Sequence, residues 1–366
     1  MNSTRPSAPS QPAHPDARAG VDLLVGEALQ QRASDLVVEP TAEDFRIDFR
    51  IDGLVRTHQT VSPEIGQGLV NRFMVAAKLL TYRRDIPQEG HWTLAGSPAG
   101  DVDLRVSVMP TNHGLRVAVR LPAELLQPRE LEALGLSGPV VAGLREYASA
   151  DSGMLLLVGP AGSGKTTTIY ALLDMIRQAA AGLSIVALED PIERDLPGVT
   201  QIQVTPFGEL TYERALRSML RQDPQVLALG EIRDAATASV AVQAALSGHR
   251  LLSTLHAASP GGAVVRLLEM GLERYQITGS LWGVLSMRLL RRRDANGGYA
   301  GRIPVASLAR ITPELREAIT NGRPPAEVEA LMQPQSAYTT LAEAAAELIE
   351  RGLTDQAEVD RVLGSG

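Results

Sequence analysis

The sequence contains no cysteine, few aromatic residues and only two lysines among its 366 residues. Without cysteine the chain can form no disulfide bond, no cysteine-ligated zinc site and no thiol-based active site. Aromatic residues make up 4% of the chain and hydrophobic residues 44%, which is typical of a globular protein with an aliphatic core. The length allows two or three domains.

Long hydrophobic runs are also missing. No apolar run approaches the roughly 20 residues that a membrane-spanning helix needs, and the N-terminus lacks the apolar core of a signal peptide. We therefore expect a soluble protein with no transmembrane segment. The chain has 42 acidic and 35 basic residues, and the net charge of −7 gives no indication of a general nucleic-acid binder. We expect no direct contact with nucleic acid.

The first third of the chain predicts a tail followed by a small α+β domain. Residues 1–20 carry four prolines among Ser, Ala and Gln, and this composition predicts a disordered tail. From residue 21 apolar residues recur at helical spacing, which predicts a helix. Alternation of apolar and polar residues then predicts half-buried strands at 45–52, 102–108 and 115–121. We assign residues 21–121 to this domain.

Residues 122–136 are interpreted as a linker or a short helix, and the pattern changes after them. In residues 137–366 short apolar runs alternate with helical patterns. The strand candidates are residues 154–158, 185–188, 226–229 and 251–255, and a helix is expected to start at Lys165. This order is typical of a mostly parallel sheet covered by helices. The Ala-, Leu- and Glu-rich segment 303–366 is predicted to be helical.

One of the two lysines lies in a stretch that fits the phosphate-binding loop G-x-x-x-x-G-K-[ST]. Its residues are Gly159, Pro160, Ala161, Gly162, Ser163, Gly164, Lys165 and Thr166, with Thr167 next to them. Backbone N–H groups of such a loop surround phosphate oxygens, Lys165 lies along the outer phosphates, and Thr166 gives its hydroxyl to Mg²⁺. A glycine-rich turn could match by chance, but the strand–loop–helix context argues against it. The loop predicts an enzyme that uses a nucleoside triphosphate with Mg²⁺, and the family resemblance described below implies that the nucleotide is ATP.

Two acidic residues follow two of the predicted strands. Glu189 opens the segment 189–193 at the end of one strand, and Glu231 follows the strand 226–229. Ligands of such sheets bind at the carboxyl ends of the strands, where a carboxylate can orient the attacking water or the water shell of the metal. We expect Glu231 to reach Mg²⁺ through water. A solvated acidic turn is the alternative for each residue on its own.

His249 and His256 bracket the predicted strand 251–255. A single histidine is more often structural than catalytic, and the sequence offers no cysteine or H-E-x-x-H motif that would indicate zinc. We therefore expect no zinc site. Arg288 and residues 291–293 form a basic cluster that we place near the end of a helix, where pairing with the helix C-terminus is favoured over contact with acidic lipid.

Taken together, these motifs resemble the secretion-superfamily ATPases of type II secretion and type IV pili over nearly the whole chain, from about residue 21 to 364. The phosphate loop continues as in that family through Thr168, and residues 189–193 look like its acidic box. Residues 216–224 and 230–234 resemble its Walker B region, and residues 248–256 its histidine box. In the first domain, residues 33–40, 50–53 and 87–90 follow the family pattern.

The resemblance implies a fold and further site residues. The expected fold is α/β, a RecA-like P-loop ATPase domain with a smaller N-terminal α+β (PAS-like) domain. Arg105 and Arg120 look like the two arginine fingers that stabilise charge on the γ-phosphate. The alternative is that they are only the outward residues of alternating strands. Glu189 and Glu231 are then the catalytic carboxylates, in roles left open between them, and His256 senses the γ-phosphate.

The resemblance also implies partners and a place in the cell. It implies a homo-hexamer that works beneath a polytopic inner-membrane platform protein and is cytoplasmic, peripheral to the membrane through partners. The family's paired-cysteine zinc module is absent, residues 291–298 take its place, and no separate N-terminal docking domain is expected. Val37, Leu115 and Gln225 replace residues usual in the family, which we expect to tune the domain without abolishing hydrolysis.

We expect a motor that assembles a type IV pilus or a type II secretion pseudopilus, because residues 301–305 and 352–354 look like that branch. The length is closer to the pilus retraction ATPases, which are the first alternative. A DNA-processing or conjugation ATPase and a non-hydrolysing nucleotide-binding scaffold are the others.

Overall fold

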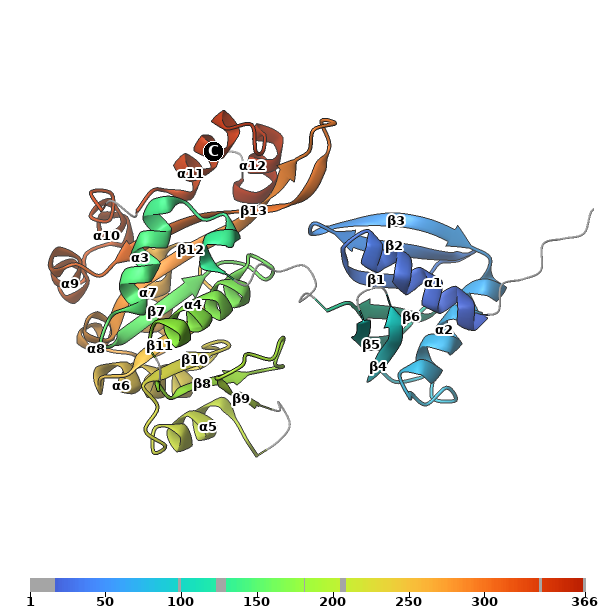
Figure 1. Cartoon of the computed structure of the whole chain (residues 1–366), viewed down its shortest axis with the longest axis horizontal. Coiled ribbons are helices and arrows are strands. Elements are labelled where there is room, and N and C mark those ends of the chain that lie inside the picture. Colours follow the sequence, from blue (N-terminus) through green and yellow to red (C-terminus); the bar gives the residue numbers. More distant parts are fainter. Residues whose placement is uncertain are drawn as a thin grey trace, which may run out of the picture. The chain divides into compact units, whose positions relative to one another are not determined.

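The structure, a computed structural model, describes residues 17–97, 100–122, 130–180, 182–204, 209–335 and 338–364. The chain divides into two compact units, residues 1–126 and 127–366 (Figure 1), and each is described by itself. Most of the predicted tail and much of the predicted linker lie outside the described residues. Helix α1 (Ala17–Gln30) includes residues 17–20, which the sequence had assigned to the tail.

The first unit is a six-stranded antiparallel sheet with two helices packed on it. Its strands are β1 (Ala33–Pro40), β2 (Phe45–Ile51), β3 (Leu54–Val61), β4 (Gln88–Ser97), β5 (Gly100–Thr111) and β6 (Gly114–Arg120), in the order β3-β2-β1-β6-β5-β4. Helices α1 and α2 (Pro63–Ala76) contact each other and the sheet. The alternation read from the sequence is confirmed, because Ile47, Val106 and Val119 all point into one core.

The second unit is a seven-stranded sheet. Its strands are β7 (Gly153–Val158), β8 (Ile185–Glu189), β9 (Thr200–Gln203), β10 (Val226–Leu229), β11 (Arg250–Leu255), β12 (Leu281–Arg293) and β13 (Tyr299–Arg310), in the order β13-β12-β7-β11-β10-β8-β9. All neighbours are parallel except β12 and β13, which form a long antiparallel hairpin. The four predicted parallel strands are confirmed as β7, β8, β10 and β11.

The helices of this unit lie on both faces of the sheet. They are η2 (Leu131–Leu134), α3 (Gly138–Ala148), α4 (Lys165–Ala179), α5 (Tyr212–Met219), α6 (Ala235–Leu246), α7 (Pro260–Glu269), α8 (Arg274–Ser280), α9 (Pro313–Thr320), α10 (Pro325–Ala330), α11 (Leu341–Glu350) and α12 (Gln356–Leu363). The predicted helix start at Lys165 is confirmed. On one face Leu155 and Leu157 of β7 pack with α3 and α4.

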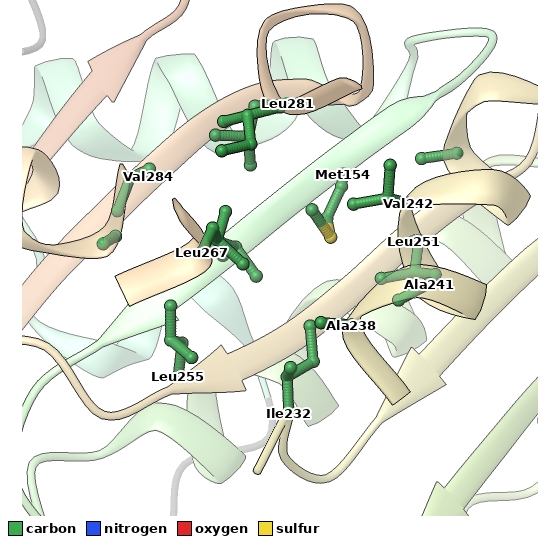
Figure 2. Close-up of a cluster of buried hydrophobic side chains, with 14 of the residues drawn as sticks. Met154, Ile232, Ala238, Ala241, Val242, Leu251, Leu255, Leu267, Leu281 and Val284 are labelled. Atoms are coloured by element: carbon green, nitrogen blue, oxygen red, sulfur yellow. The ribbon is translucent and has the colours of Figure 1, made fainter. Parts of the chain in front are cut away.

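On the other face Met154, Leu156 and Val158 of β7 pack with α6 and α7. Figure 2 shows the side chains of this second core, with Met154 between Val242 of α6 and Leu267 of α7 and Leu251 beside Ala241. Because β7 is buried on both faces, every residue from Met154 to Val158 must be apolar, which explains the unbroken run in the sequence. The same core holds the strand ends in place for the site.

Two predictions about the last third of the chain were wrong. Arg288 and residues 291–293 lie on strand β12 rather than near a helix end, and the first part of the segment predicted to be helical, up to Arg310, is strand β13. The residues of β12 include many good helix formers, such as Leu, Met and Arg. Pairing with β7 on one side and β13 on the other overrides that preference.

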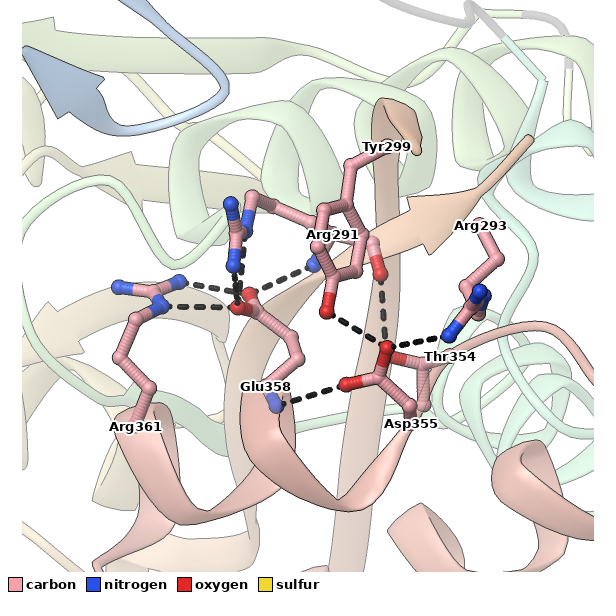
Figure 3. A network of polar contacts seen from close by, with 7 residues as sticks. All are labelled: Arg291, Arg293, Tyr299, Thr354, Asp355, Glu358 and Arg361. Carbon is pink, nitrogen blue, oxygen red and sulfur yellow. Dashed lines mark hydrogen bonds and ion pairs between the residues drawn. The ribbon is translucent and has the colours of Figure 1, made fainter. Parts of the chain in front are cut away.

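Ion pairs around a buried carboxylate join helix α12 to this hairpin (Figure 3). Glu358 of α12 is fully buried and accepts hydrogen bonds from the backbone N–H and the guanidinium of Arg291 on β12, each 2.8 Å long. Arg361, one helical turn further on, also donates to Glu358. Asp355 pairs with Arg293 at 2.8 Å. Two residues of the basic cluster, Arg291 and Arg293, therefore hold α12 to the sheet.

Candidate active site

The strand order brings four predicted site segments to one edge of the second sheet. The neighbouring strands β7, β11, β10 and β8 are parallel, so their carboxyl ends lie side by side. The phosphate loop follows β7, His256 follows β11, Glu231 follows β10, and Glu189 ends β8. This is the edge at which open parallel sheets bind their ligands.

The phosphate loop has a backbone that requires its glycines. Gly159, Gly162 and Gly164 have φ values of 148°, 73° and 95°, in the region that side chains with a Cβ rarely adopt. A Cβ on Gly159 would lie 2.5 Å from the carbonyl oxygen of Met287 on β12. The loop therefore runs directly against its neighbouring strand and leads straight into α4.

Lys165, the first residue of α4, folds back over the loop. Its ammonium group donates hydrogen bonds of 2.8 Å to the carbonyl oxygens of Gly159 and Pro160, and the side chain is 9% exposed. Burial lowers the pKa of Lys165, and the negative charge of Glu231 acts against this shift. A buried ammonium held only by main-chain oxygens is placed to exchange them for a phosphate.

The loop fits a nucleotide for a second reason. The hydroxyl oxygen of Ser163 is buried and, within the described residues, has no hydrogen-bond partner. A phosphate oxygen would supply the missing partner, since buried polar groups are otherwise satisfied. Thr166 and Thr167 follow Lys165 in the first turn of α4, and both are half-buried. These residues would hold the phosphates and the metal.

Glu231 lies between a histidine and an arginine side chain. His256 Nε2 is 3.0 Å from Glu231 Oε1, and Arg233 Nε donates to Glu231 Oε2 at 2.8 Å. Arg233 also lies 3.6 Å from Asp190 in the acidic segment after β8. The structure thus joins the predicted acidic box, Walker B region and histidine box in one charged cluster. Asp234, the last residue of that region, caps α6 by accepting from Thr237 N–H at 2.8 Å.

Glu189 has a different environment. Its carboxylate is buried and accepts hydrogen bonds from the hydroxyl of Tyr170 on α4 and from Gln201 Nε2 on β9, the latter at 2.8 Å. Burial raises the pKa of Glu189 above its ordinary value, and the two hydrogen bonds only partly oppose that rise. Neither partner was predicted from the sequence. A tyrosine in the buried face of a helix needs a partner for its hydroxyl, and that signal could have found Tyr170.

His249 and Arg288 lie in different environments, and Arg288 does not lie where the sequence predicted. His249 Nδ1 lies 2.9 Å from the carbonyl oxygen of Ala244, a contact that supports the structural interpretation. Arg288 lies on β12 beside the phosphate loop, with Nη1 bonded to Met287 O at 3.0 Å and Nη2 to Ala258 O at 3.2 Å. Burial lowers the pKa of Arg288. Arg288 belongs to the basic cluster found in the sequence. Because that cluster was predicted to lie near the end of a helix, the position of Arg288 beside the phosphate loop was not predicted.

Arg105 and Arg120 belong to the first unit, where they are direct cross-strand partners on β5 and β6. Arg105 pairs with Glu89 at 2.6 Å and Arg120 with Asp35 at 3.4 Å, and both guanidinium groups are exposed. Neighbouring residues of the same strands, such as Leu104, point into the core. Both arginines are therefore outward residues of alternating strands, side by side on one face.

The donor set near the loop also suits Mg²⁺. Mg²⁺ takes hydroxyl and carboxylate oxygens, substrate phosphates and water, and rarely an all-protein cage. Thr166 and Glu231 offer such oxygens. Within the described ranges no three His, Cys, Asp or Glu side chains converge to form a dedicated metal site.

The chain is similar in sequence and in fold to known proteins. Residues 16–361 match the family described as type II/IV secretion system protein. The chain belongs to this family. The type II secretion system protein HxcR of Pseudomonas aeruginosa is 38% identical over 324 residues, covering 83% of this chain and 68% of HxcR. The type II secretion system ATPase E of Vibrio cholerae is 42% identical over 272 residues, covering 74% of this chain and 53% of that protein.

A solved structure agrees with this family membership. The pilus retraction motor PilT with bound ADP has a TM-score of 0.68 and 27% identity, and the match covers 93% of this chain and 96% of PilT. The chain is thus a P-loop ATPase with a RecA-like domain and a smaller N-terminal domain, which confirms the family resemblance and the predicted fold class. It spans about half to two thirds of the length of the two secretion relatives. None of the helices within the described ranges combines the length and apolar composition that a bilayer crossing demands.

Proposed function

We propose that this protein is an ATP-hydrolysing motor that powers assembly of a type II secretion pseudopilus or a type IV pilus. The observation that carries the proposal is the single sheet edge that holds the phosphate loop, Glu231 and Glu189 together. A binding scaffold needs the loop alone. Two carboxylates at the ends of β10 and β8 add the means to order a metal's water shell and to activate water.

Each side chain has a role in this proposal. Lys165 and the loop N–H groups bind the phosphates, and Thr166 and Glu231 hold Mg²⁺, Glu231 through water. Bound Mg²⁺ neutralises charge on the phosphates. Arg105 and Arg120 reach the γ-phosphate from the first unit when it closes on a nucleotide, and His256 reports the γ-phosphate through its contact with Glu231. Closure of one unit over the other converts hydrolysis into motion.

The proposed assembly is a hexamer on the cytoplasmic side of the inner membrane. It would act on a polytopic platform protein, which adds pilin-like subunits to a fibre as the motor turns or lifts it. The similarity to type II secretion proteins supports this partner, and the 38% and 42% identities exceed the 27% identity to the retraction motor. Light scattering of the purified protein with and without ATP tests the hexamer.

The two lysines of the chain offer a matched test of ATP hydrolysis. Lys165→Ala removes the ammonium group at the phosphates and should abolish ATP binding and phosphate release. Lys78→Asn removes the only other lysine, at a position with φ of 59° that asparagine tolerates, and should leave both unchanged. Chelation of Mg²⁺ should stop hydrolysis by the wild-type protein. Equal turnover in both lysine variants would contradict the proposed site.

The direction of the motor is tested in the host cell. Deletion of the gene should stop secretion or fibre formation if the motor assembles subunits, whereas a retraction motor would leave cells with more fibres. A DNA-handling ATPase would instead show DNA-stimulated hydrolysis with steep salt dependence. A scaffold would bind ATP in its hexameric form without releasing phosphate.

A further inference from the structure

The carboxylate of Glu189 is buried without a cationic partner in the part of the chain that the structure describes. Buried carboxylates are usually paired with Arg or Lys, because the charge is costly to remove from water. Glu231, at the next strand end, follows that rule with Arg233. Glu189 instead accepts hydrogen bonds from two neutral groups, the Tyr170 hydroxyl and the Gln201 amide. Within the described residues, no ion pair therefore reduces the affinity of this carboxylate for a proton.

Tyr170 and Gln201 each make hydrogen bonds in addition to the one to the carboxylate of Glu189. The Tyr170 hydroxyl also accepts from the backbone N–H of Glu193 at 3.2 Å. Gln201 donates to the carbonyl oxygen of Arg194 at 2.8 Å and accepts from Leu196 N–H at 2.8 Å. The two side chains thus fix both oxygens of Glu189 and the loop that follows it.

Tyr170 also connects this carboxylate to the phosphate loop. It lies on α4, the helix that begins at Lys165, five residues further along. The guanidinium of Arg194, in the loop after Glu189, lies 5.2 Å from the centre of the Tyr170 ring. Tyr170 therefore connects α4 to that loop. Helix α4 therefore carries both the lysine of the phosphate loop and, just over one turn later, the hydroxyl that orients Glu189.

We infer that Tyr170 and Gln201 are positioning residues for ATP hydrolysis, which orient Glu189 as the acceptor of the proton from the attacking water. This inference rests on the proposed function. In the step it serves, a bond forms between the water oxygen and the γ-phosphorus. The bond from that phosphorus to the bridging oxygen of ADP breaks, and the water proton passes to Glu189. Glu231, already paired with the guanidinium of Arg233, keeps the role at the metal's water shell.

The test is Tyr170→Phe, which removes one hydroxyl and leaves the ring. The kcat for ATP should fall by about 10- to 100-fold, the effect of one lost hydrogen bond to a charged group. The KM and the Kd for a fluorescent ATP analogue should stay at wild-type values, because the loop from Gly159 to Thr166 is untouched. Tyr147→Phe is the matched control, since its buried hydroxyl donates to the carbonyl oxygen of Leu251 at 2.8 Å, away from any carboxylate.

A double-mutant cycle with Glu189→Gln separates positioning from structure. Tyr170→Phe should have no further effect on kcat once Glu189 is neutralised, because it acts through that carboxylate. If Tyr170→Phe folds poorly, Gln201→Met tests the same prediction, because it removes the other side-chain hydrogen bond to Glu189. An unchanged kcat in Tyr170→Phe, a loss equal to that of Tyr147→Phe, or a full further loss in the Glu189→Gln background would each overturn the inference.

The same measurements distinguish this inference from the proposed function. A wild-type protein that releases no phosphate removes the proposed function itself. A wild-type protein that hydrolyses ATP, together with a Glu189→Gln variant of equal kcat, overturns only the positioning of Glu189 and leaves the motor standing.

Discussion

His256 Nε2 lies 3.0 Å from Oε1 of Glu231, so the ends of β11 and β10 are joined by their side chains. Glu231→Gln keeps the shape of this contact but removes the negative charge that, in the proposed mechanism, orders the metal's water shell. The variant should bind ATP and lose turnover by about 100-fold or more. Fluorescent-analogue binding and phosphate release measure the two effects separately.

The control for this variant is Glu269→Gln, which neutralises an exposed glutamate that pairs with Arg266 at 2.9 Å on α7. It changes the net charge by the same amount, away from the sheet edge, and should hydrolyse ATP at the wild-type rate. Wild-type turnover in Glu231→Gln would remove Glu231 from the active site.

The paired arginines of the first unit give a second prediction. Arg105→Ala and Arg120→Ala should each lower kcat by about 1,000-fold if the guanidinium groups stabilise charge on the γ-phosphate. Their ion pairs are exposed and contribute about 1 kcal/mol at most, so the thermal stability of the protein should hardly change. Phosphate release and a melting curve measure the two properties.

Arg116→Ala is the matched control for both arginines. Arg116 lies on the same strand as Arg120 and pairs with Glu39 at 2.5 Å, and its side chain is 40% exposed, close to the 45% of Arg105. It should keep the wild-type rate. Loss of activity of the same size in all three variants would show that the strands need arginine for folding, and the finger role would fall.

The third prediction concerns the contact between the phosphate loop and β12. Gly159→Ala places a Cβ 2.5 Å from the Met287 carbonyl oxygen, which is backbone and cannot swing away. The loop must shift, and we expect ATP binding to fall below detection. Gly271→Ala also places a Cβ on a residue with positive φ, 84°, but with open space around it, and should cost only about 1 kcal/mol of stability without a change in ATP binding.

The sequence predicted those features that depend on local pattern. Strands β5 and β6 could be read from alternation because one face is buried and the other is not. The phosphate loop could be read because its glycines are fixed by backbone geometry. The parallel order of β7, β8, β10 and β11 brings their ends together, so residues on separate strands could be assigned to one edge.

The remaining features depend on contacts between distant segments. Strand β12 has the composition of a helix, and only its two neighbours make it a strand, so Arg288 could not be placed beside the phosphate loop. Gln201 reaches Glu189 from β9, a short edge strand with no alternation to reveal it. The partner of a buried carboxylate is set by tertiary packing, which a single sequence does not state.

The last prediction concerns the buried carboxylate that fastens α12 to the β12–β13 hairpin (Figure 3). Burial opposes ionisation of Glu358, but hydrogen bonds from Arg361 and Arg291 outweigh it and lower the pKa to about 2. Glu358→Gln leaves both arginines without their charge partner, which should cost about 3 kcal/mol. Amide hydrogen exchange in residues 356–363 and thermal unfolding measure the loss. Glu347→Gln, on the exposed side of α11, should show neither effect.

The pH dependence of this difference follows from the direction of the shift. The folded pKa lies below the ordinary value of 4.5, so the stabilisation by Glu358 is fully present above about pH 4.5. It is lost as the pH falls through 4.5 towards 2, because the unfolded chain takes up the proton first. The gap in melting temperature between the wild type and Glu358→Gln should therefore be constant near neutral pH and narrow below pH 4.5. A gap that stays constant down to pH 2.5 would mean that the carboxylate acts through its shape and hydrogen bonds alone, and not through its charge.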